Sequence, residues 1–221
     1  MALLALLLAL TPGLPASQAP TRPSPDALAR ALQDRYDAVV DFTADFVQTY
    51  QGGVLSTTAT EQGTVLIKKP GKMRWNYTSP ETHLFVSDGL TVYSYVPVDN
   101  QVYVFDMPSG DEATTPVLFL AGRGDLTRDF TVTYAELPDL PPDTYALRLT
   151  PLQVEPDYEW LTLVVDSHTL QIRRLLAHYL EGGTSTFVFT NLKENVGLAD
   201  ALFTFRIPLG ADVITSDNSF P

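Results

Sequence analysis

The chain has 221 residues, no cysteine and a formal net charge of −12 at pH 7. Because so large an excess of negative charge cannot neutralise phosphates, the composition excludes a typical nucleic-acid-binding protein and disfavours contact with anionic membrane surfaces. Charged residues make up 18% of the chain and aromatic residues 10%, which is typical of a globular, strand-rich protein and not of a disordered one.

Residues 1–19 predict a secretory signal peptide. The apolar run ALLALLLAL is followed by TPG and by small residues that end at Ala19, and the run is too short to span a bilayer. The lysine or arginine that usually precedes such a run is missing, so a membrane anchor stays as the alternative. Without cysteine, disulfides and the acyl anchor of a bacterial lipoprotein are excluded. We expect a soluble exported protein with a proline-rich linker over residues 20–25 and one domain over residues 26–221.

The first element predicted after the linker is an amphipathic helix. Ser24 or Asp26 can cap its N-terminus. Apolar side chains at near-helical spacing follow, namely Leu28, Leu32, Tyr36 and Val39 or Val40. A helix with one apolar face must cover another apolar surface, and the remaining chain is expected to supply it.

Alternation of apolar and polar residues predicts strands along most of the remaining chain. In residues 41–50, for example, Phe42, Ala44 and Phe46 fall on one face. Further strands are predicted over residues 58–68, 72–77, 83–87, 91–97, 101–106, 129–134, 145–150, 158–166, 171–180 and 184–190. The short spacings and turn signals between them predict an antiparallel meander.

The segment KKPGKMRWNYT, residues 68–78, carries the clearest alternation. Met73, Trp75 and Tyr77 share one face, and the opposite face is polar. Pro70-Gly71 predicts a turn before this strand, and SDG at residues 87–89 predicts one after it. Continued backwards across the first turn, the apolar face includes Lys69, Ile67 and Val65, which places a lysine at the rim of an apolar surface.

Two interruptions of the strand pattern predict short helices. The apolar run Val117, Leu118, Phe119 and Leu120 follows TTP and ends at Ala121-Gly122, which is the pattern of a cap, a first-turn proline and a C-terminal glycine. Residues 195–202 predict a second short helix, after which residues 203–205 are expected to return to strand.

A large antiparallel sheet must pack on a second layer or curl, and a curled sheet needs its concave face filled. The pattern leaves two alternatives open, an ordinary core without a cavity and a cavity closed by the short helices. In the second case the lining would be Phe42, Phe46, Met73, Trp75, Tyr77, Val117 and Phe119.

The order of these elements resembles the periplasmic outer-membrane lipoprotein carriers, the LolA-like proteins. The resemblance extends over most of the chain from about Asp26. Its matching segments are FTADFVQ at residues 42–48, GTVLIKKPGKMRW at 63–75, VSDG at 86–89, VYSY at 92–95, FTFRIP at 203–208 and GADVI at 210–214.

The resemblance implies a mainly β fold with short helices, an incomplete and strongly curved antiparallel β-barrel of about 11 strands with a helical lid over an apolar cavity. It implies a monomeric periplasmic carrier without a cofactor. Acylated lipoproteins would be its cargo, an inner-membrane lipoprotein-releasing ABC transporter its donor, and an outer-membrane lipoprotein acceptor its receiver.

The same resemblance assigns roles to residues. An acyl-chain cavity would be lined by Phe42, Phe46, Val65, Ile67, Met73, Trp75 and Tyr77, and the lid would include Leu28, Leu32, Val117, Leu118, Phe119 and Leu120. The family commonly has an arginine that holds the lid closed by hydrogen bonds, and here Lys69 stands at that position. Lysine lacks the planar fork of arginine, so a latch role for Lys69 and a plain edge-strand lysine are both open.

Other functional classes have less support. An enzyme is not expected, because His83, His168 and His178 have no metal-ligand spacing and no catalytic or phosphate-binding motif occurs. Four acids recur at short spacing, and we interpret them as a solvated face and not as a catalytic pair; they are Asp34, Asp37, Asp41 and Asp45. The remaining alternative is an envelope lipid-binding or lipoprotein-sensing module that does not transfer cargo, since one fold can serve both functions.

Overall fold

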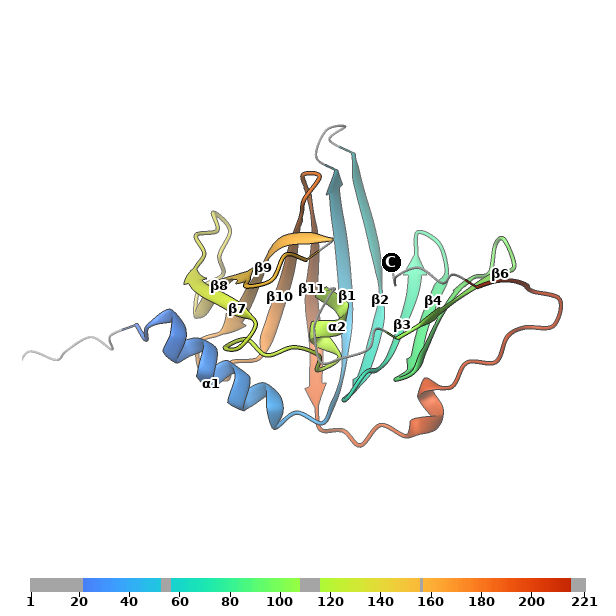
Figure 1. Ribbon diagram of the computed structural model, residues 1–221, viewed down its shortest axis with the longest axis horizontal. Coiled ribbons are helices and arrows are strands. Elements are labelled where there is room, and N and C mark those ends of the chain that lie inside the picture. Colours follow the sequence, from blue (N-terminus) through green and yellow to red (C-terminus); the bar gives the residue numbers. More distant parts are fainter. Residues whose placement is uncertain (1–21, 53–56, 108–115, 156, 216–221) are drawn as a thin grey trace, which may run out of the picture.

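The computed structural model describes residues 22–52, 57–107, 116–155 and 157–215, and these form one strongly curved sheet with few helices (Figure 1). The strands are β1 (Asp41–Gly52), β2 (Thr58–Lys68), β3 (Lys72–Ser79), β4 (His83–Asp88), β5 (Thr91–Val96), β6 (Gln101–Asp106), β7 (Phe130–Tyr134), β8 (Thr144–Pro151), β9 (Tyr158–Asp166), β10 (Ile172–Tyr179), β11 (Gly183–Glu194) and β12 (Asp212–Thr215). The helices are α1 (Pro25–Asp37), α2 (Pro116–Leu120) and the 3₁₀ helix η1 (Asp200–Phe203).

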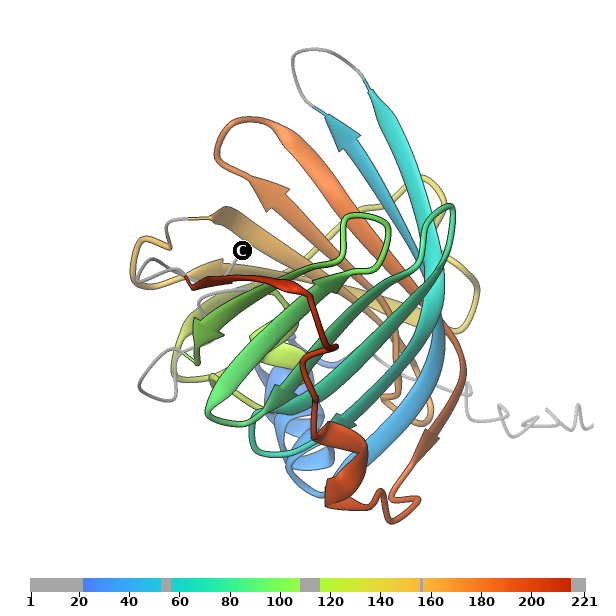
Figure 2. The same cartoon turned by 90° about the vertical axis from the view of Figure 1, so that its right-hand side faces the viewer.

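The sheet is open, with β12 and β7 at its two ends. The strand order is β12-β6-β5-β4-β3-β2-β1-β11-β10-β9-β8-β7, so each run of consecutive strands is a meander and the two runs join where β1 pairs with β11. The predicted incomplete, strongly curved barrel is confirmed, as Figure 2 shows most directly.

The sheet has 12 strands among the described residues, in agreement with the predicted number of about 11. Two details of the sequence-based prediction are wrong. Strand β12 pairs with β6 in parallel, which departs from a purely antiparallel meander. Residues 203–205 do not return to strand, because Phe203 ends η1 and the chain then runs extended without a ladder partner. Strand pairing resumes only at β12.

Helix α1 begins where the sequence predicts. Ser24 is its N-cap, and the Ser24 hydroxyl accepts a hydrogen bond of 3.2 Å from the Ala27 N–H. Pro25 occupies the first turn, where a missing N–H costs nothing. The apolar face of α1 is buried at Leu28, Leu32 and Tyr36, and the helix packs beside β7.

Helix α2 lies inside the curve of the sheet (Figure 1). Its described side chains Leu118, Phe119 and Leu120 are buried and belong to one hydrophobic cluster with α1 and the concave face of the sheet. The cap predicted at Thr114 and Thr115 lies outside the described residues. The short apolar helix predicted over residues 117–120 is therefore present, and it forms part of the core.

The segment from 195 to 211, here called the C-terminal strap, crosses the convex face of the sheet (Figure 2). Lys68 Nζ donates to the Leu198 carbonyl at 2.8 Å, and Arg74 donates to the Leu202 carbonyl at 3.2 Å. Phe205 packs against the rings of Tyr93 and Tyr95. The strap thus carries the chain from β11 back to β6, where β12 is added to the sheet.

Candidate functional site

An aromatic floor lies on the concave face of the sheet. It consists of Phe46, Trp75, Phe187 and Phe189, which come from β1, β3 and β11. The Phe46 and Trp75 rings meet edge to face with centroids 5.0 Å apart, and the Trp75 and Phe187 centroids are 5.5 Å apart. The buried indole nitrogen Nε1 of Trp75 has no hydrogen-bond partner among the described residues.

The structure brings the predicted cavity residues together on this face. Six of them are buried, namely Phe42, Phe46, Val65, Ile67, Met73 and Trp75, and Tyr77 is half-buried at the edge of the same cluster. Direct pairing of Ile67 with Met73 and of Val65 with Trp75 explains this, because paired residues of neighbouring strands share a face. Their role toward an acyl chain stays a prediction.

The predicted lid residues also meet. Leu28 and Leu32 of α1 and Leu118, Phe119 and Leu120 of α2 are buried in the same cluster, and Val117 packs against it partly buried. We call helices α1 and α2, with these six side chains, the lid.

Tyr36 joins the two helices of the lid. Its ring stacks on Phe119 with centroids 5.8 Å apart, and its hydroxyl donates a hydrogen bond to the Leu120 carbonyl. Burial, and to a lesser degree the negative charge of Glu194, raises the pKa of this hydroxyl, so the hydroxyl remains a donor across the whole neutral range.

Lys69, in the turn between β2 and β3, contacts α1 and the segment just after α2. Its ammonium group donates to the Tyr36 carbonyl in the last turn of α1 and lies 3.7 Å from the centroid of the Tyr36 ring. Its aliphatic chain passes Gly122, just after α2, so closely that a Cβ at that glycine would lie 2.3 Å from Lys69 Cδ. Lys69 therefore sits where a latch residue would act, and the latch role itself stays a prediction.

The environment of Lys69 changes its proton affinity. Burial lowers the pKa of Lys69 to about 8, although the negative charges of Asp37 and Glu194 oppose this effect. The ammonium group and the neutral amine are thus populated to a similar extent near pH 8, a property that an arginine at the same position would not have.

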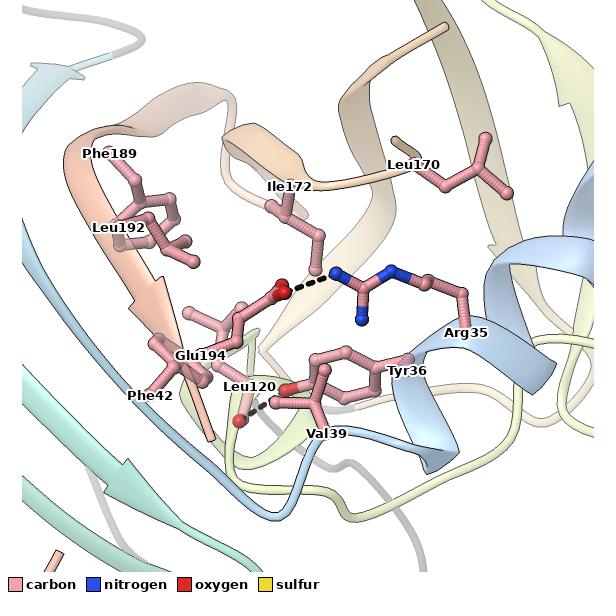
Figure 3. A pocket seen from close by; sticks show the side chains of 10 residues that line it. All are labelled: Arg35, Tyr36, Val39, Phe42, Leu120, Leu170, Ile172, Phe189, Leu192 and Glu194. Carbon is pink, nitrogen blue, oxygen red and sulfur yellow. Dashed lines mark hydrogen bonds and ion pairs between the residues drawn. The ribbon is translucent and has the colours of Figure 1, made fainter. Parts of the chain in front are cut away.

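A small pocket remains where the lid meets β1, β10 and β11 (Figure 3). Its volume is about 10 Å³, which is room for roughly one water molecule. Its lining residues are Arg35, Tyr36, Val39, Phe42, Leu120, Leu170, Ile172, Phe189, Leu192 and Glu194. At this pocket the lid side chains pack against the concave face, and an acyl chain could enter here only if they moved aside.

An ion pair borders this pocket. Arg35 of α1 pairs with Glu194 of β11 (Figure 3). The Arg35 Nε–H also donates to the Thr169 carbonyl at 3.2 Å. The Arg35 and Glu194 side chains are 33% and 18% exposed, so solvent screening makes this pair a modest fastening of α1 to the sheet.

Of the residues that line this pocket, only Phe42 and Leu120 were predicted as site residues from the sequence. Sequence reasoning missed the bridging role of Tyr36 and the pair Arg35–Glu194, because each depends on contacts between residues more than 80 positions apart. The helical spacing of Tyr36 was a usable signal for its burial, but not for its hydrogen bond to α2.

The interpretation of Asp41 as part of a solvated face is wrong. Asp41 is 3% exposed. Its carboxylate accepts hydrogen bonds from three backbone N–H groups of the C-terminal strap, those of Val196, Gly197 and Leu198, at 2.7, 3.2 and 2.8 Å. Asp41 fastens the strap to the start of β1.

Among the residues that the structure describes, no helix is long and apolar enough to cross a membrane. The architecture that remains is a curved, mainly antiparallel sheet whose apolar concave face is covered by two helices. A solved structure of an uncharacterized conserved protein from Thermus thermophilus shares this fold. It matches with a TM-score of 0.53 at 14% identity and covers 85% of this chain and 99% of that one.

Relatives with more similar sequences identify the family. The outer-membrane lipoprotein carrier protein of Cupriavidus taiwanensis is 31% identical over 195 residues, which are 87% of this chain and 90% of the relative. That of Chromohalobacter salexigens is 31% identical over 188 residues, 84% and 86% of the two chains. The model of the outer membrane lipoprotein carrier protein LolA matches residues 37–206. The chain belongs to the LolA family.

Proposed function

We propose that this protein is a periplasmic carrier of lipoproteins. It would take acylated lipoproteins from an inner-membrane ABC transporter, shield their acyl chains against the concave face, and release them to an outer-membrane acceptor. Membership of the LolA family and the names of the curated relatives support the carrier role. The observation that carries the mechanism is the lid, whose apolar side chains occupy the space that acyl chains would need.

The energetics of acyl burial require such a lid. Enclosing one 16-carbon chain would contribute on the order of 12 kcal/mol at about 0.8 kcal/mol per methylene, which is already a nanomolar interaction. A carrier that bound so tightly would not release its cargo. Displacing Leu118, Phe119 and Leu120 from the core costs part of this free energy, so net binding becomes moderate and transfer to an acceptor becomes possible.

The test is release of newly made lipoproteins from spheroplasts by the purified mature protein. We expect wild type to recover lipoprotein in the soluble fraction as a one-to-one complex. Phe119 would also line the loaded cavity, so Phe119→Glu should recover roughly tenfold less, because a carboxylate is costly to bury against acyl chains. Leu209→Glu is the matched control, since Leu209 is fully exposed on the C-terminal strap.

Recovery by wild type and by Leu209→Glu, with loss in a folded Phe119→Glu variant, would support the carrier and the apolar site together. If wild type solubilises no lipoprotein, the carrier proposal fails. A lipid-binding or lipoprotein-sensing module would then be the better description.

A further inference from the structure

A row of hydrogen-bonding side chains crosses the concave face just beyond the aromatic floor. We call it the polar belt, and its members are Gln48, Glu61, Tyr77, His83, Ser94, Tyr179 and Ser185. The register places them on one face. Gln48 pairs with Phe187 of the floor and with Glu61, and Tyr77 pairs with His83.

The belt is connected across the sheet. The Tyr77 hydroxyl donates to Gln48 Oε1 at 2.9 Å, and Gln48 Nε2 donates to the Ser185 hydroxyl at 3.0 Å. His83 Nε2 lies 2.7 Å from the Ser94 hydroxyl, and the His83 ring stacks on Tyr77. These contacts link β11, β1, β3, β4 and β5 at one level of the concave face.

Belt and floor are adjacent along each strand. Gln48 follows Phe46 by two residues on β1, and Tyr77 follows Trp75 by two residues on β3. Two residues of a strand span about 7 Å, so a molecule lying on the floor would meet hydrogen-bonding groups within a few bond lengths. The face therefore changes from apolar to polar over a short distance, as an acylated molecule does at its ester groups.

The hydrogen-bond donors of the floor and the belt suit a neutral acceptor. Trp75 Nε1–H is a donor only and has no partner among the described residues. The Gln48 amide carries two N–H groups, of which one bonds to Ser185. Burial lowers the pKa of His83 and raises that of Tyr77, so both side chains are neutral near pH 7. The belt contains no lysine or arginine to pair with a phosphate.

We propose that Trp75 and the polar belt form a hydrogen-bonding site for the carbonyl groups of acyl esters, at the boundary between the acyl chains and the polar part of a bound lipid. This inference rests on the proposed function and specifies which part of the cargo the concave face recognises. An ester carbonyl is an acceptor, and it would satisfy the indole N–H that the closed structure leaves without a partner. A buried donor without a partner is otherwise unfavourable.

The test compares two lipids that differ only in their carbonyl groups. Dipalmitoylglycerol carries two ester carbonyls, and dihexadecylglycerol has ether links and equally long chains. Trp160→Phe leaves Trp75 as the only tryptophan, so its fluorescence reports binding at the floor. We expect the ester to bind roughly tenfold more tightly than the ether, as one or two additional hydrogen bonds imply.

Variants locate the effect. Gln48→Leu, in the Trp160→Phe background, should lower the affinity for the ester and leave that for the ether unchanged. Gln62→Leu is the matched control, because Gln62 lies one position along β2 from Glu61 and is exposed on the opposite face. Binding to Trp75→Phe is measured by displacement of a fluorescent fatty acid. This variant should also show a smaller preference for the ester. Equal affinities of wild type for ester and ether, or equal losses for both lipids in Gln48→Leu, would overturn the inference.

Acyl esters occur in lipoproteins and in phospholipids, so the same titration is run with a diacylglyceryl-cysteinyl peptide and with phosphatidylglycerol of equal chain length. We expect the peptide to bind more tightly, because the belt offers no cation for the phosphate. Tighter binding of the phospholipid would overturn the assignment to a neutral ester. If wild type shows no preference for the ester but still releases lipoprotein from spheroplasts, only this inference is refuted. If it releases no lipoprotein, the proposed function is refuted.

Discussion

At the scale of single residues, Lys69 stands where the resemblance to the LolA-like carriers led us to expect an arginine. Its ammonium group has one hydrogen-bond acceptor on α1 and one aromatic face, both from Tyr36. An arginine could reach two acceptors at once. Lysine gives fewer contacts but adds a proton equilibrium close to neutral pH, since its pKa is lowered to about 8.

This equilibrium predicts that the lid closes more firmly as the pH rises. If opening exposes Lys69 and returns its pKa to about 10.4, the closed form binds fewer protons between pH 8 and pH 10. Raising the pH through this window therefore favours the closed form and weakens lipid binding. We expect affinity for a fluorescent fatty acid to fall by up to about tenfold from pH 7 to pH 9.5, less than the full pKa shift implies because Lys69 is partly exposed.

Lys69→Arg is the control for this prediction, since arginine keeps its charge throughout the window. Its affinity should not change over the same pH range. A pH dependence of equal size in Lys69→Arg and wild type would show that another group is responsible.

At the scale of elements, α2 is the part of the lid whose movement the proposed function needs. The absence of cysteine from the natural chain permits a direct test. A Cβ at Gly122 would lie 3.3 Å from Lys69 Cβ, close to the separation of about 3.8 Å found in disulfides. The double variant Lys69→Cys/Gly122→Cys should therefore form a bond between the end of α2 and the β2–β3 turn.

We expect the oxidised double variant to lose most of its lipid binding and to regain it after reduction, because α2 can leave the concave face only when the bond is open. Binding is measured with the same fluorescent fatty acid before and after dithiothreitol. The two single-cysteine variants control for the loss of Lys69 and for the positive φ of Gly122. Full binding by the oxidised form would show that α2 does not need to move.

The elements themselves were largely predictable from sequence. Strict alternation identified β3, and the run of four apolar residues identified α2, because each signal is local. Strand β12 was missed, since four mostly exposed residues carry little pattern and its partner β6 is more than 100 positions away. Phe46 and Trp75 of the aromatic floor were named from the sequence, but Phe187 and Phe189 were not. The hydrogen bonds of Tyr36 and Asp41 were also missed, because these join segments that only the complete fold brings together.

At the scale of the whole molecule, the C-terminal strap connects the two runs of strands. Asp41 is its main attachment at the start of β1, and Lys68 bonds to Asp200 further along. Because the Asp41 carboxylate is buried and accepts three backbone N–H groups, its removal leaves several donors without a partner.

We therefore predict that Asp41→Ala lowers the free energy of unfolding by about 3 kcal/mol. Urea unfolding followed by circular dichroism measures this change. Asp45→Ala is the matched control, since Asp45 accepts one exposed hydrogen bond from Asn191 and should change stability by less than about 1 kcal/mol. Similar losses in the two variants would mean that the strap contributes little to stability.

The separate ends of the sheet have a further consequence for the size of cargo. In a closed barrel the number of strands and their stagger fix the radius, and a larger guest requires broken ladder bonds. Here β7 and β12 are not hydrogen-bonded to each other, so the sheet can flatten by small changes of twist spread over many strand pairs. One protein molecule can then hold cargo of different widths while the hydrogen bonds between its strands stay intact.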